Sequence, residues 1–493
     1  MGLSKIAVLA LAGVSFLALP AVAQQKDSVT LCMTLEPPIL DPTQGAAQAI
    51  KEVTYGNIFE GLVGIDRAGK IVPKLAESWT ISPDALVYTF KLRSGVKYHD
   101  GAELTSADVK FSFDRAVAPD SKNATKKVFA PIKSIETPDA TTVKITLSEP
   151  SANFLFGLGY GDSSILNPKS VADASTKPVG TGAYKFVEWS RGNRLVYTRN
   201  DAYWGTKPAI KDVIYRFMPD AQAQMAAIQS GDCDALTNFG SYENIETLKK
   251  DARLKVTVGN TEGETILAMN NAKPPFNDVR VRKAIAHAID RKAVIDGAMN
   301  GAAQPIGTHF SPNHPAYVDL TGATPYDPKK AKALLAEAGF PNGFSTTLKL
   351  PPPPYARRSG EVVAALLADI GIKVSIEPVE FPQWLERVYR NKDYDLSLIA
   401  HTEPLDIEIY SRDDYYFQYK SDEMKRLVKA AETAVDDATR NKLYQDAQRR
   451  IVEDQVNVYL FMLPKTTVFK ANLSGMWEGW PIPVSPAQEL SWK

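Results

Sequence analysis

Short β-patterned segments alternate with amphipathic helical segments along most of this chain, and this alternation constrains the fold more than any other feature. In one stretch, apolar residues occupy every second position, as in a strand with one buried face: Leu86, Tyr88, Phe90 and Leu92. In another, they fall at helical spacing: Val281, Ala284, Ile285, Ala288 and Ile289. The alternation predicts an α/β fold with sheets covered by helices.

The same criteria locate further elements. A hairpin is predicted over 133–147, around Pro138, Asp139 and Ala140. Predicted helices are one that opens at Ser106 and others over 221–229, 329–338, 360–370 and 436–453. Predicted strands lie over 28–33, 234–238, 373–377 and 458–463. The chain that remains after the first residues is long enough for more than one domain.

The first residues have the pattern of a secretory signal. A single positive charge, Lys5, precedes an apolar run over 6–19, and Ala21-Val22-Ala23 is a small-x-small triplet of the kind that signal peptidase cleaves. The apolar run is too short to span a bilayer comfortably. We therefore expect residues 1–23 to be a cleaved signal peptide and the mature protein to begin near Gln24 in a bacterial periplasm.

The charge balance and the cysteines exclude some functions. The chain has 57 Lys and Arg against 57 Asp and Glu, so it lacks the positive footprint of a nucleic-acid-binding protein. Its two cysteines, Cys32 and Cys233, are too few for a disulfide framework. They are either two buried free thiols or a single pair.

No motif in the chain makes a strong case for catalysis or metal binding. Residues 64–70 have phosphate-loop spacing, but Ile71 follows where a Ser or Thr is needed, and a hairpin turn explains the segment better. Residues 161–164 resemble a serine hydrolase motif without the Gly-x-Ser-x-Gly elbow. His309 and His314 lie in a Pro-rich segment that we expect to be loop surface. We predict no catalytic residue, no metal site and no cofactor.

Several segments resemble a known family. Residues 72–79, 88–101 and 104–112 closely resemble the signature of the family 5 bacterial extracellular solute-binding proteins, which are the receptors of peptide, nickel and related ABC importers. Three further segments, 178–184, 200–204 and 274–291, resemble other landmarks of the same family. The resemblance extends over essentially the whole mature chain, with the segments in the same order.

The resemblance implies a two-lobed periplasmic binding protein fold of type II, with an extra subdomain in the first lobe. Carried onto this chain, the first lobe comprises residues 24–52, 175–262 and 468–493. The extra subdomain comprises 53–174, and the second lobe 263–467. Two crossovers, near 260–266 and 464–470, form the hinge. Cys32 and Cys233 both fall in the first lobe, so their pairing stays possible.

The resemblance also implies a function without catalysis. A monomeric receptor captures a small solute between its lobes and delivers it to an inner-membrane ABC permease with its ATPase subunits. Small peptides are the leading ligand class. An oligosaccharide or another non-peptide solute is the alternative, for which Tyr415 and Tyr416 offer aromatic platforms. A periplasmic hydrolase or chaperone is a less favoured function, because neither a catalytic triad nor a metal set is recognisable.

The resemblance places candidate ligand-binding residues in the second lobe. Segment 398–406 resembles the loop that anchors a peptide amine, but Ala400 stands where the anchoring Asp is usual. Either Glu403 or Asp406 replaces it, with His401 and Thr402 beside them, or the ligand has no amine there.

A second segment, at Tyr355, resembles the one that binds a peptide carboxylate. Arg357 is the first choice for that role and Arg358 the second, although both also suit the surface of a helix start. Trp384 is either part of the pocket or part of the packing. The opposite wall would contain Thr34, Leu35 and Glu36.

Overall fold

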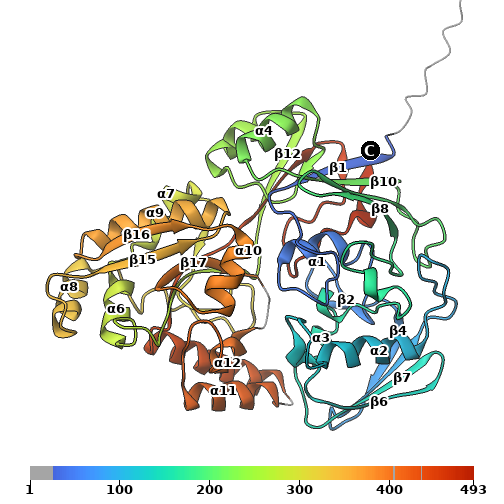
Figure 1. Ribbon diagram of the computed structural model, residues 1–493, viewed down its shortest axis with the longest axis horizontal. Coiled ribbons are helices and arrows are strands. Elements are labelled where there is room, and N and C mark those ends of the chain that lie inside the picture. The colour runs from blue at the N-terminus through green and yellow to red at the C-terminus, as the bar shows by residue number, and fades with distance from the viewer. Residues whose placement is uncertain (1–25, 403–405, 435) are drawn as a thin grey trace, which may run out of the picture.

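The computed structural model of this chain describes residues 26–402, 406–434 and 436–493. The predicted signal peptide, residues 1–23, and the predicted mature start at Gln24 lie outside these ranges. Within them, no helix combines the length and the apolar character that crossing a membrane requires. The chain forms two lobes, each built on its own sheet (Figure 1).

The first lobe contains a seven-stranded mixed sheet in the order β12-β19-β11-β1-β10-β9-β8. Its strands are β1 (Ser28–Met33), β8 (Tyr184–Ser190), β9 (Arg194–Arg199), β10 (Asp212–Phe217), β11 (Ala235–Leu236), β12 (Leu254–Gly259) and β19 (Lys465–Lys470). The central β1 runs parallel to both of its neighbours, β10 and β11. Parallel central strands are buried on both faces, and Val29, Leu31 and Cys32 are accordingly inaccessible. Helices α1 (Gln48–Thr54), α4 (Ala221–Ser230) and α5 (Ile245–Lys249) belong to this lobe.

The same half of the molecule contains a smaller antiparallel sheet in the order β4-β5-β7-β6. Its strands are β4 (Ala76–Ile81), β5 (Val87–Leu92), β6 (Ile132–Asp139) and β7 (Thr142–Leu147), so the predicted hairpin is confirmed. Helix α2 (Ser106–Val117) begins at a capping box of Thr105 and Asp108 and packs Val109 and Phe113 against this sheet. The short α3 (Phe154–Gly157) follows β7. The segment with phosphate-loop spacing forms the hairpin of β2 (Val63–Ile65) and β3 (Ile71–Pro73), as predicted.

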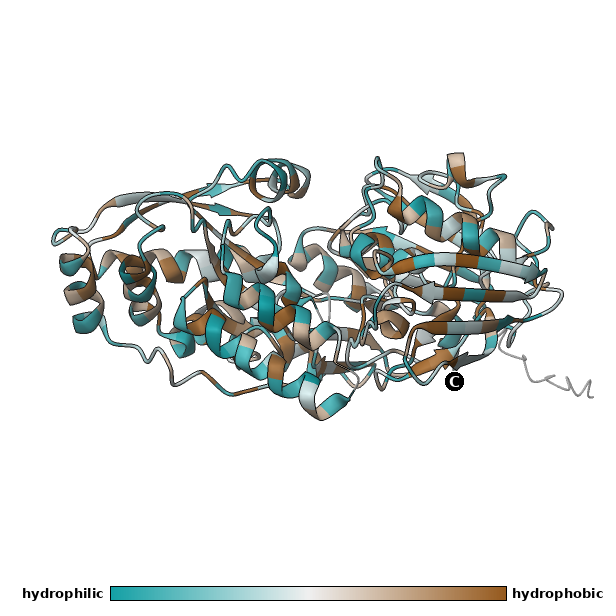
Figure 2. Ribbon diagram, turned by 90° about the horizontal axis from the view of Figure 1, so that it is seen from below, coloured by the Kyte–Doolittle hydropathy of each residue, from teal (hydrophilic) through white to brown (hydrophobic). Residues whose placement is uncertain are grey.

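The second lobe contains a six-stranded sheet in the order β14-β18-β13-β17-β15-β16. Its strands are β13 (Glu264–Met269), β14 (Gln304–Pro305), β15 (Ser345–Leu350), β16 (Lys373–Pro378), β17 (Leu396–His401) and β18 (Asn457–Met462). Its helices are α6 (Val279–Ala288), α7 (Arg291–Met299), α8 (Pro328–Glu337), α9 (Pro354–Ala368), α10 (Phe381–Trp384), α11 (Asp422–Glu432) and α12 (Asp437–Glu453). Helices of this lobe carry both apolar and polar segments (Figure 2), as expected where one face packs on the lobe and the other meets solvent.

Two of these helices show what the sequence does and does not predict. Helix α6 is capped by Asp278, and the predicted apolar face of Val281, Ala284, Ile285 and Ala288 is fully buried. Helix α9 begins at Pro354, six residues before the predicted start at 360. The run of prolines at 351–354 is typical of a stiff connection, but Pro354 occupies the first helical position, where its missing N–H costs nothing.

The chain crosses between the two large sheets twice. Residues 260–263 join β12 to β13, and Leu463 and Pro464 join β18 to β19. The crossovers contact each other: the Leu463 N–H donates to the Gly263 carbonyl at 2.8 Å, and the Thr261 hydroxyl donates to the Leu463 carbonyl at 2.5 Å. The lobe boundary expected at 467/468 falls within β19, so the second crossover lies at 463–464 instead.

Cys32 and Cys233 form a disulfide with a Cα–Cα distance of 6.0 Å. The alternative of two free thiols is therefore wrong. The sequence cannot distinguish the two, because β1 and β11 become neighbours only through the parallel pairing of the sheet. The bond is buried among Ile228, Leu236 and Val468.

Replacing both cysteines by alanine should lower the free energy of unfolding by about 2–5 kcal/mol, because the bond closes a loop of 201 residues in the unfolded chain. Urea denaturation of the oxidised wild type and of the double variant measures the difference. A reductant should lower the stability of the wild type and leave the double variant unchanged. Equal stability of all the forms would contradict a structural role for the bond.

Candidate ligand-binding cleft

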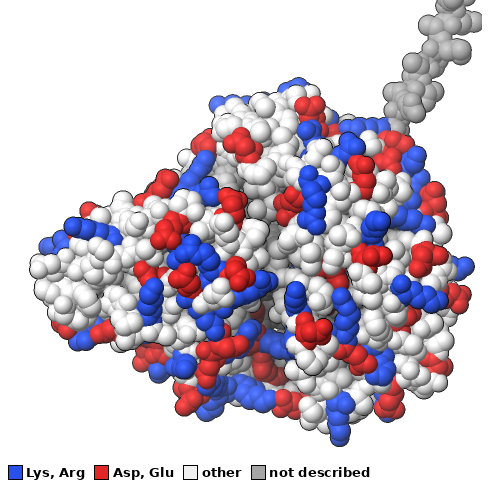
Figure 3. Space-filling model, in the orientation of Figure 1, with Lys and Arg blue, Asp and Glu red and all other residues white. Residues whose placement is uncertain are grey.

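A cavity of about 1310 Å³ lies between the two lobes. Its lining combines the segment after β1, helix α1 and the region 124–160 with α9, α10 and the loops that follow β17. Figure 3 shows that the surface is hollowed where the lobes meet and that charged side chains stand along both edges. A cavity of this size is large enough for a ligand of several residues.

The first-lobe wall is formed where β1 ends. The prolines at 37 and 38 prevent the strand from continuing, so Thr34, Leu35 and Glu36 turn into the cavity lining. The Glu36 carboxylate accepts hydrogen bonds from the Trp189 indole N–H at 2.9 Å and from the Gly192 N–H at 3.0 Å. Because the Glu36 carboxylate accepts these hydrogen bonds, it fixes the first-lobe wall to the segment that contains Trp189 and Gly192. The Thr34 hydroxyl donates to the Asn238 carbonyl at 3.3 Å.

The second-lobe wall contains Tyr355 and Arg357, at the start of α9. The Tyr355 hydroxyl accepts a hydrogen bond from the Ala400 N–H at 3.0 Å, which ties α9 to β17. Burial raises the pKa of Tyr355, so it remains a neutral phenol. The Arg357 side chain is 42% exposed, and its nearest carboxylate, that of Glu380, is 3.7 Å away. Its buried Nε has no hydrogen-bond partner among the described residues.

Two further residues that were predicted to bind ligand, Arg358 and Trp384, instead make contacts with other protein side chains. Arg358 is not part of the cavity lining; its guanidinium pairs with Glu243 of the first lobe at 2.5 Å. This hydrogen-bonded pair lowers the pKa of Glu243 to about 2 and joins the lobes. Trp384 lines the cavity but is only 3% exposed, and its indole N–H donates to the Ser397 hydroxyl at 2.9 Å. It supports the wall by packing.

Segment 400–402 runs along the cavity, and Glu403 lies outside the described residues. His401 is buried, with its Nε2 2.9 Å from the Tyr416 hydroxyl. The Thr402 hydroxyl donates to the Gln48 side-chain oxygen across the cleft at 3.1 Å. Tyr415 and Tyr416 both belong to the second-lobe core, at 6% and 1% exposed, and of the two Tyr415 contributes to the cavity lining.

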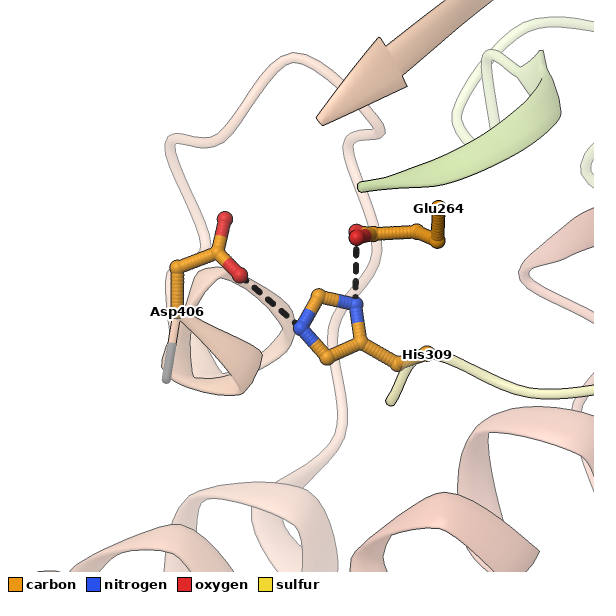
Figure 4. A group of neighbouring side chains, drawn as sticks. All are labelled: Glu264, His309 and Asp406. Carbon is orange, nitrogen blue, oxygen red and sulfur yellow. Dashed lines mark ion pairs between the residues drawn. The ribbon is translucent and has the colours of Figure 1, made fainter. Parts of the chain in front are cut away.

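Asp406 belongs to a buried group of three side chains that the sequence did not reveal. Its carboxylate lies 2.9 Å from the Nε2 of His309, and the Glu264 carboxylate lies 2.9 Å from the Nδ1 of the same ring (Figure 4). The expectation that His309 lies on a loop surface is wrong, since its side chain is 1% exposed. His314 is also partly enclosed, with its ring stacked on Phe310 at 3.8 Å. The proline-rich sequence gives no indication that the loop folds back onto β13.

The group is arranged as an imidazolium between two carboxylates. Burial alone would lower the pKa of His309, but Glu264 and Asp406 together raise it to about 10. Burial also raises the pKa of Glu264, and the charge of His309 opposes that change. The three residues have the ligand types of a metal site. In the structure the two carboxylates pair with opposite nitrogens of the ring (Figure 4).

Beside Asp406, an acidic corner is formed by three carboxylates of the second lobe: Asp406, Glu408 and Glu432. Lys127 reaches this corner from the first lobe, and its Nζ lies 2.6 Å from Glu408 and 3.3 Å from Glu432. The second oxygen of Glu408, Oε2, is buried and has no hydrogen-bond partner among the described residues. The acidic corner therefore holds more negative charge than Lys127 balances.

The lobes also contact each other beside the acidic corner. The Ala152 N–H donates to the Glu432 carbonyl at 2.8 Å, and the Asn153 amide donates to the Tyr444 hydroxyl at 2.8 Å. Lys429 pairs with Glu149 in the same region. The cleft is thus bounded by the crossovers at one edge and by these polar contacts at another.

The imidazole of His309 should remain protonated above pH 8. Since its pKa in the folded protein lies above the ordinary 6.5, the charged ring stabilises the fold fully below pH 6.5, and that contribution is lost as the pH rises through about 10. NMR of histidine-labelled protein measures the titration, with His309→Gln to assign the signal. A His309 signal that titrates near pH 6.5 would contradict the ion-pair arrangement.

Comparison with known proteins identifies the family. Residues 70–419 match the family model described as the middle of the bacterial extracellular solute-binding proteins, family 5. A dipeptide-binding protein of Escherichia coli is 31% identical over 414 residues, which are 76% of each chain. A heme-binding protein A of Haemophilus influenzae is 34% identical over 66% of this chain and 65% of its own length, just under two thirds.

Comparison with solved structures leads to the same kind of protein. A periplasmic binding protein of Helicobacter pylori, associated with an ABC transporter and solved in complex with the peptide STSA, superposes with a TM-score of 0.88. It is 28% identical, and the match covers 95% of this chain and 98% of that one. The predicted two-lobed α/β fold is confirmed. The chain belongs to family 5 of the bacterial extracellular solute-binding proteins, and its role is that of the substrate-binding component of an ABC importer.

Proposed function

We propose that this protein binds a small peptide with a free amino terminus in the periplasm and delivers it to an inner-membrane permease with its ATPase subunits. The observation that carries the proposal is the acidic corner of Asp406, Glu408 and Glu432 at one end of the interlobe cavity. The relative named for dipeptides and the structural neighbour with a bound peptide support this ligand class.

A free amino terminus needs a carboxylate, and the acidic corner offers one. Ala400 has no charge to give, so the anchor must come from elsewhere in the cavity. Glu408 is 6% exposed, and one oxygen of its buried carboxylate has no hydrogen-bond donor among the described residues. An ammonium group that donates to this oxygen would remove a cost of about 1–3 kcal/mol. Asp406, whose side chain is 15% exposed, adds a second negative charge nearby.

A peptide also carries a carboxylate, for which Arg357 is suited. Its guanidinium is half exposed in the cavity, and the 3.7 Å distance to Glu380 leaves the pair loose. Because a planar guanidinium binds a carboxylate through two parallel hydrogen bonds, a ligand could replace Glu380 as its partner. Arg358 is committed to Glu243 and takes no part in this proposal.

Capture follows from the arrangement of the lobes. A ligand that touches both walls binds the closed arrangement better than an open one, and this difference in affinity drives closure. The two crossovers are the short segments about which the lobes would rotate. Arg358–Glu243 and Lys127–Glu408 each join one lobe to the other, so both ion pairs would break on opening. The ligand leaves chemically unchanged.

Short peptides should raise the melting temperature of the protein, whereas neutral oligosaccharides and metal chelates should not. A ligand present at 100 times its Kd stabilises the folded state by about 2.7 kcal/mol. A thermal-shift screen of di- to pentapeptides, oligosaccharides and metal chelates checks this, with mass spectrometry of the recovered ligand. Shifts with sugars alone would disprove the peptide proposal, and a cleaved ligand would show that the protein is an enzyme.

Glu408→Gln should weaken a peptide with a free amino terminus at least tenfold, which corresponds to about 1.4 kcal/mol, and should not affect its N-acetylated form. Lys127→Met is the matched variant, because it removes the same interlobe ion pair but leaves the carboxylate in place. It should bind the free peptide as tightly as the wild type or more tightly. Equal weakening in both variants, measured by calorimetry, would mean that the ion pair, and not an amine site, matters.

A further inference from the structure

A second cavity, of about 1230 Å³, adjoins the interlobe cleft. The two share part of their lining, including Ala124, Lys127, Tyr389 and Arg412, so they open into one another. The second cavity lies between α2 with the 122–135 segment on the first-lobe side and the turn after α10 on the second-lobe side. We call it the annex.

The charged residues that line the annex are mainly basic, whereas those that line the cleft are mainly acidic. The cleft is lined by eight carboxylate residues against four Lys and Arg, whereas the annex is lined by seven Lys and Arg against one Asp. The basic residues of the annex are Lys110, Lys122, Lys126, Lys127, Lys133, Arg390 and Arg412. A ligand that extends from the cleft into the annex therefore passes from negative to positive surroundings.

Part of this positive charge is not neutralised by the protein. Lys110 pairs with Asp114, and Arg390 pairs with Glu386. Lys122 and Lys133, in contrast, make no ion pair in the part of the chain that the structure describes. Both are exposed and belong to the annex lining. The uncompensated charge is thus at the first-lobe side of the annex.

The annex also has apolar surface between its charges. Val117 is 41% exposed, which is unusual for a large apolar side chain of this protein, and it lines the annex with Phe113, Ile135 and Leu385. Apolar surface with a basic rim suits a ligand whose stem is apolar and whose end is anionic.

We propose that the annex is an anion subsite of the ligand cleft and receives a carboxylate or phosphate group carried by a side chain near the carboxyl end of the ligand. This inference rests on the proposed function for its orientation: the ammonium group lies at the acidic corner, the terminal carboxylate pairs with Arg357, and the acidic side chain lies in the annex. It extends that function by selecting peptides that are longer than a dipeptide and acidic toward the carboxyl end. The residues that select them are Lys122 and Lys133.

The test compares the double variant Lys122→Gln/Lys133→Gln with Lys329→Gln/Lys332→Gln. The control variant removes the same charge from exposed positions on α8, which line neither cavity. In the first measurement, ³¹P NMR line broadening reports the binding of inorganic phosphate. The wild type and the control should broaden the signal, and the annex variant should weaken the effect at least fivefold. Equal broadening by the two variants would overturn the proposal.

The second measurement shows whether a ligand uses the subsite. Calorimetry compares Ala-Ala-Ala-Ala-Glu, the same peptide ending in phosphoserine, and the same peptide ending in Gln. The acidic peptides should bind the wild type and the control at least fivefold more tightly than the neutral one, and the annex variant should lose this preference. A larger preference for phosphoserine would identify phosphate as the favoured group.

The outcomes separate the two proposals. If none of the peptides binds, the proposed function fails, while the phosphate result still decides whether the annex binds anions. If the peptides bind with equal affinity whatever their last residue, the proposed function stands and the annex is not part of the ligand site.

Discussion

The hydrogen bonds between the two crossovers are the constraint on which the remaining structure depends. Leu463 donates to Gly263 and accepts from Thr261, so the two segments that join the lobes are held to each other. The lobes can change their relative orientation only about this joined pair. Other interlobe contacts, such as Arg358–Glu243 and Lys127–Glu408, consist of polar groups that water can solvate after separation. The hydrophobic cores are mainly inside the lobes, although Tyr242 and Ile245 of the first lobe join the core of the second.

This division explains how the walls of the cleft are built. On the first-lobe side, backbone contacts hold the wall, because Glu36 and Thr34 use their polar groups on neighbouring chain segments. On the second-lobe side, a buried imidazolium positions Asp406, and a phenol fixes Ala400. A neutral His309 ring has a single N–H, so removing its charge would leave one of the two carboxylates facing an unprotonated nitrogen, which is more costly than losing a surface ion pair. The position of Asp406 in the acidic corner is therefore set by His309, which belongs to another loop of the second lobe.

The sequence predicts much of the fold and little of this chemistry. The buried faces of β5 and α6 follow from local periodicity, and the predicted opening of a helix at Ser106 is confirmed by the start of α2. The family resemblance correctly indicated the fold and the role. The ion pairs of His309 could not be predicted, because Glu264, His309 and Asp406 are brought together only by the tertiary fold. The same holds for Arg358, whose partner Glu243 is in the other lobe. The sequence predicts Asp406 as a site residue but not Glu408, two residues further on. What distinguishes Glu408 from other acidic residues is the burial of its carboxylate, which the sequence does not show.

The disulfide has a consequence for how binding preferences can change. Cys32 lies near the end of β1, just ahead of the turn that contains Thr34 and Glu36, and Cys233 precedes β11, after which Asn238 reaches the cleft. Both approaches to the first-lobe wall are thereby cross-linked into one rigid frame. The second-lobe wall has no such covalent link and is held by hydrogen bonds and ion pairs, such as those of Ala400 and Asp406. Diversification of the receptor toward new cargo is accordingly easier on the second lobe, while the cross-linked wall serves as a fixed template against which each variant closes.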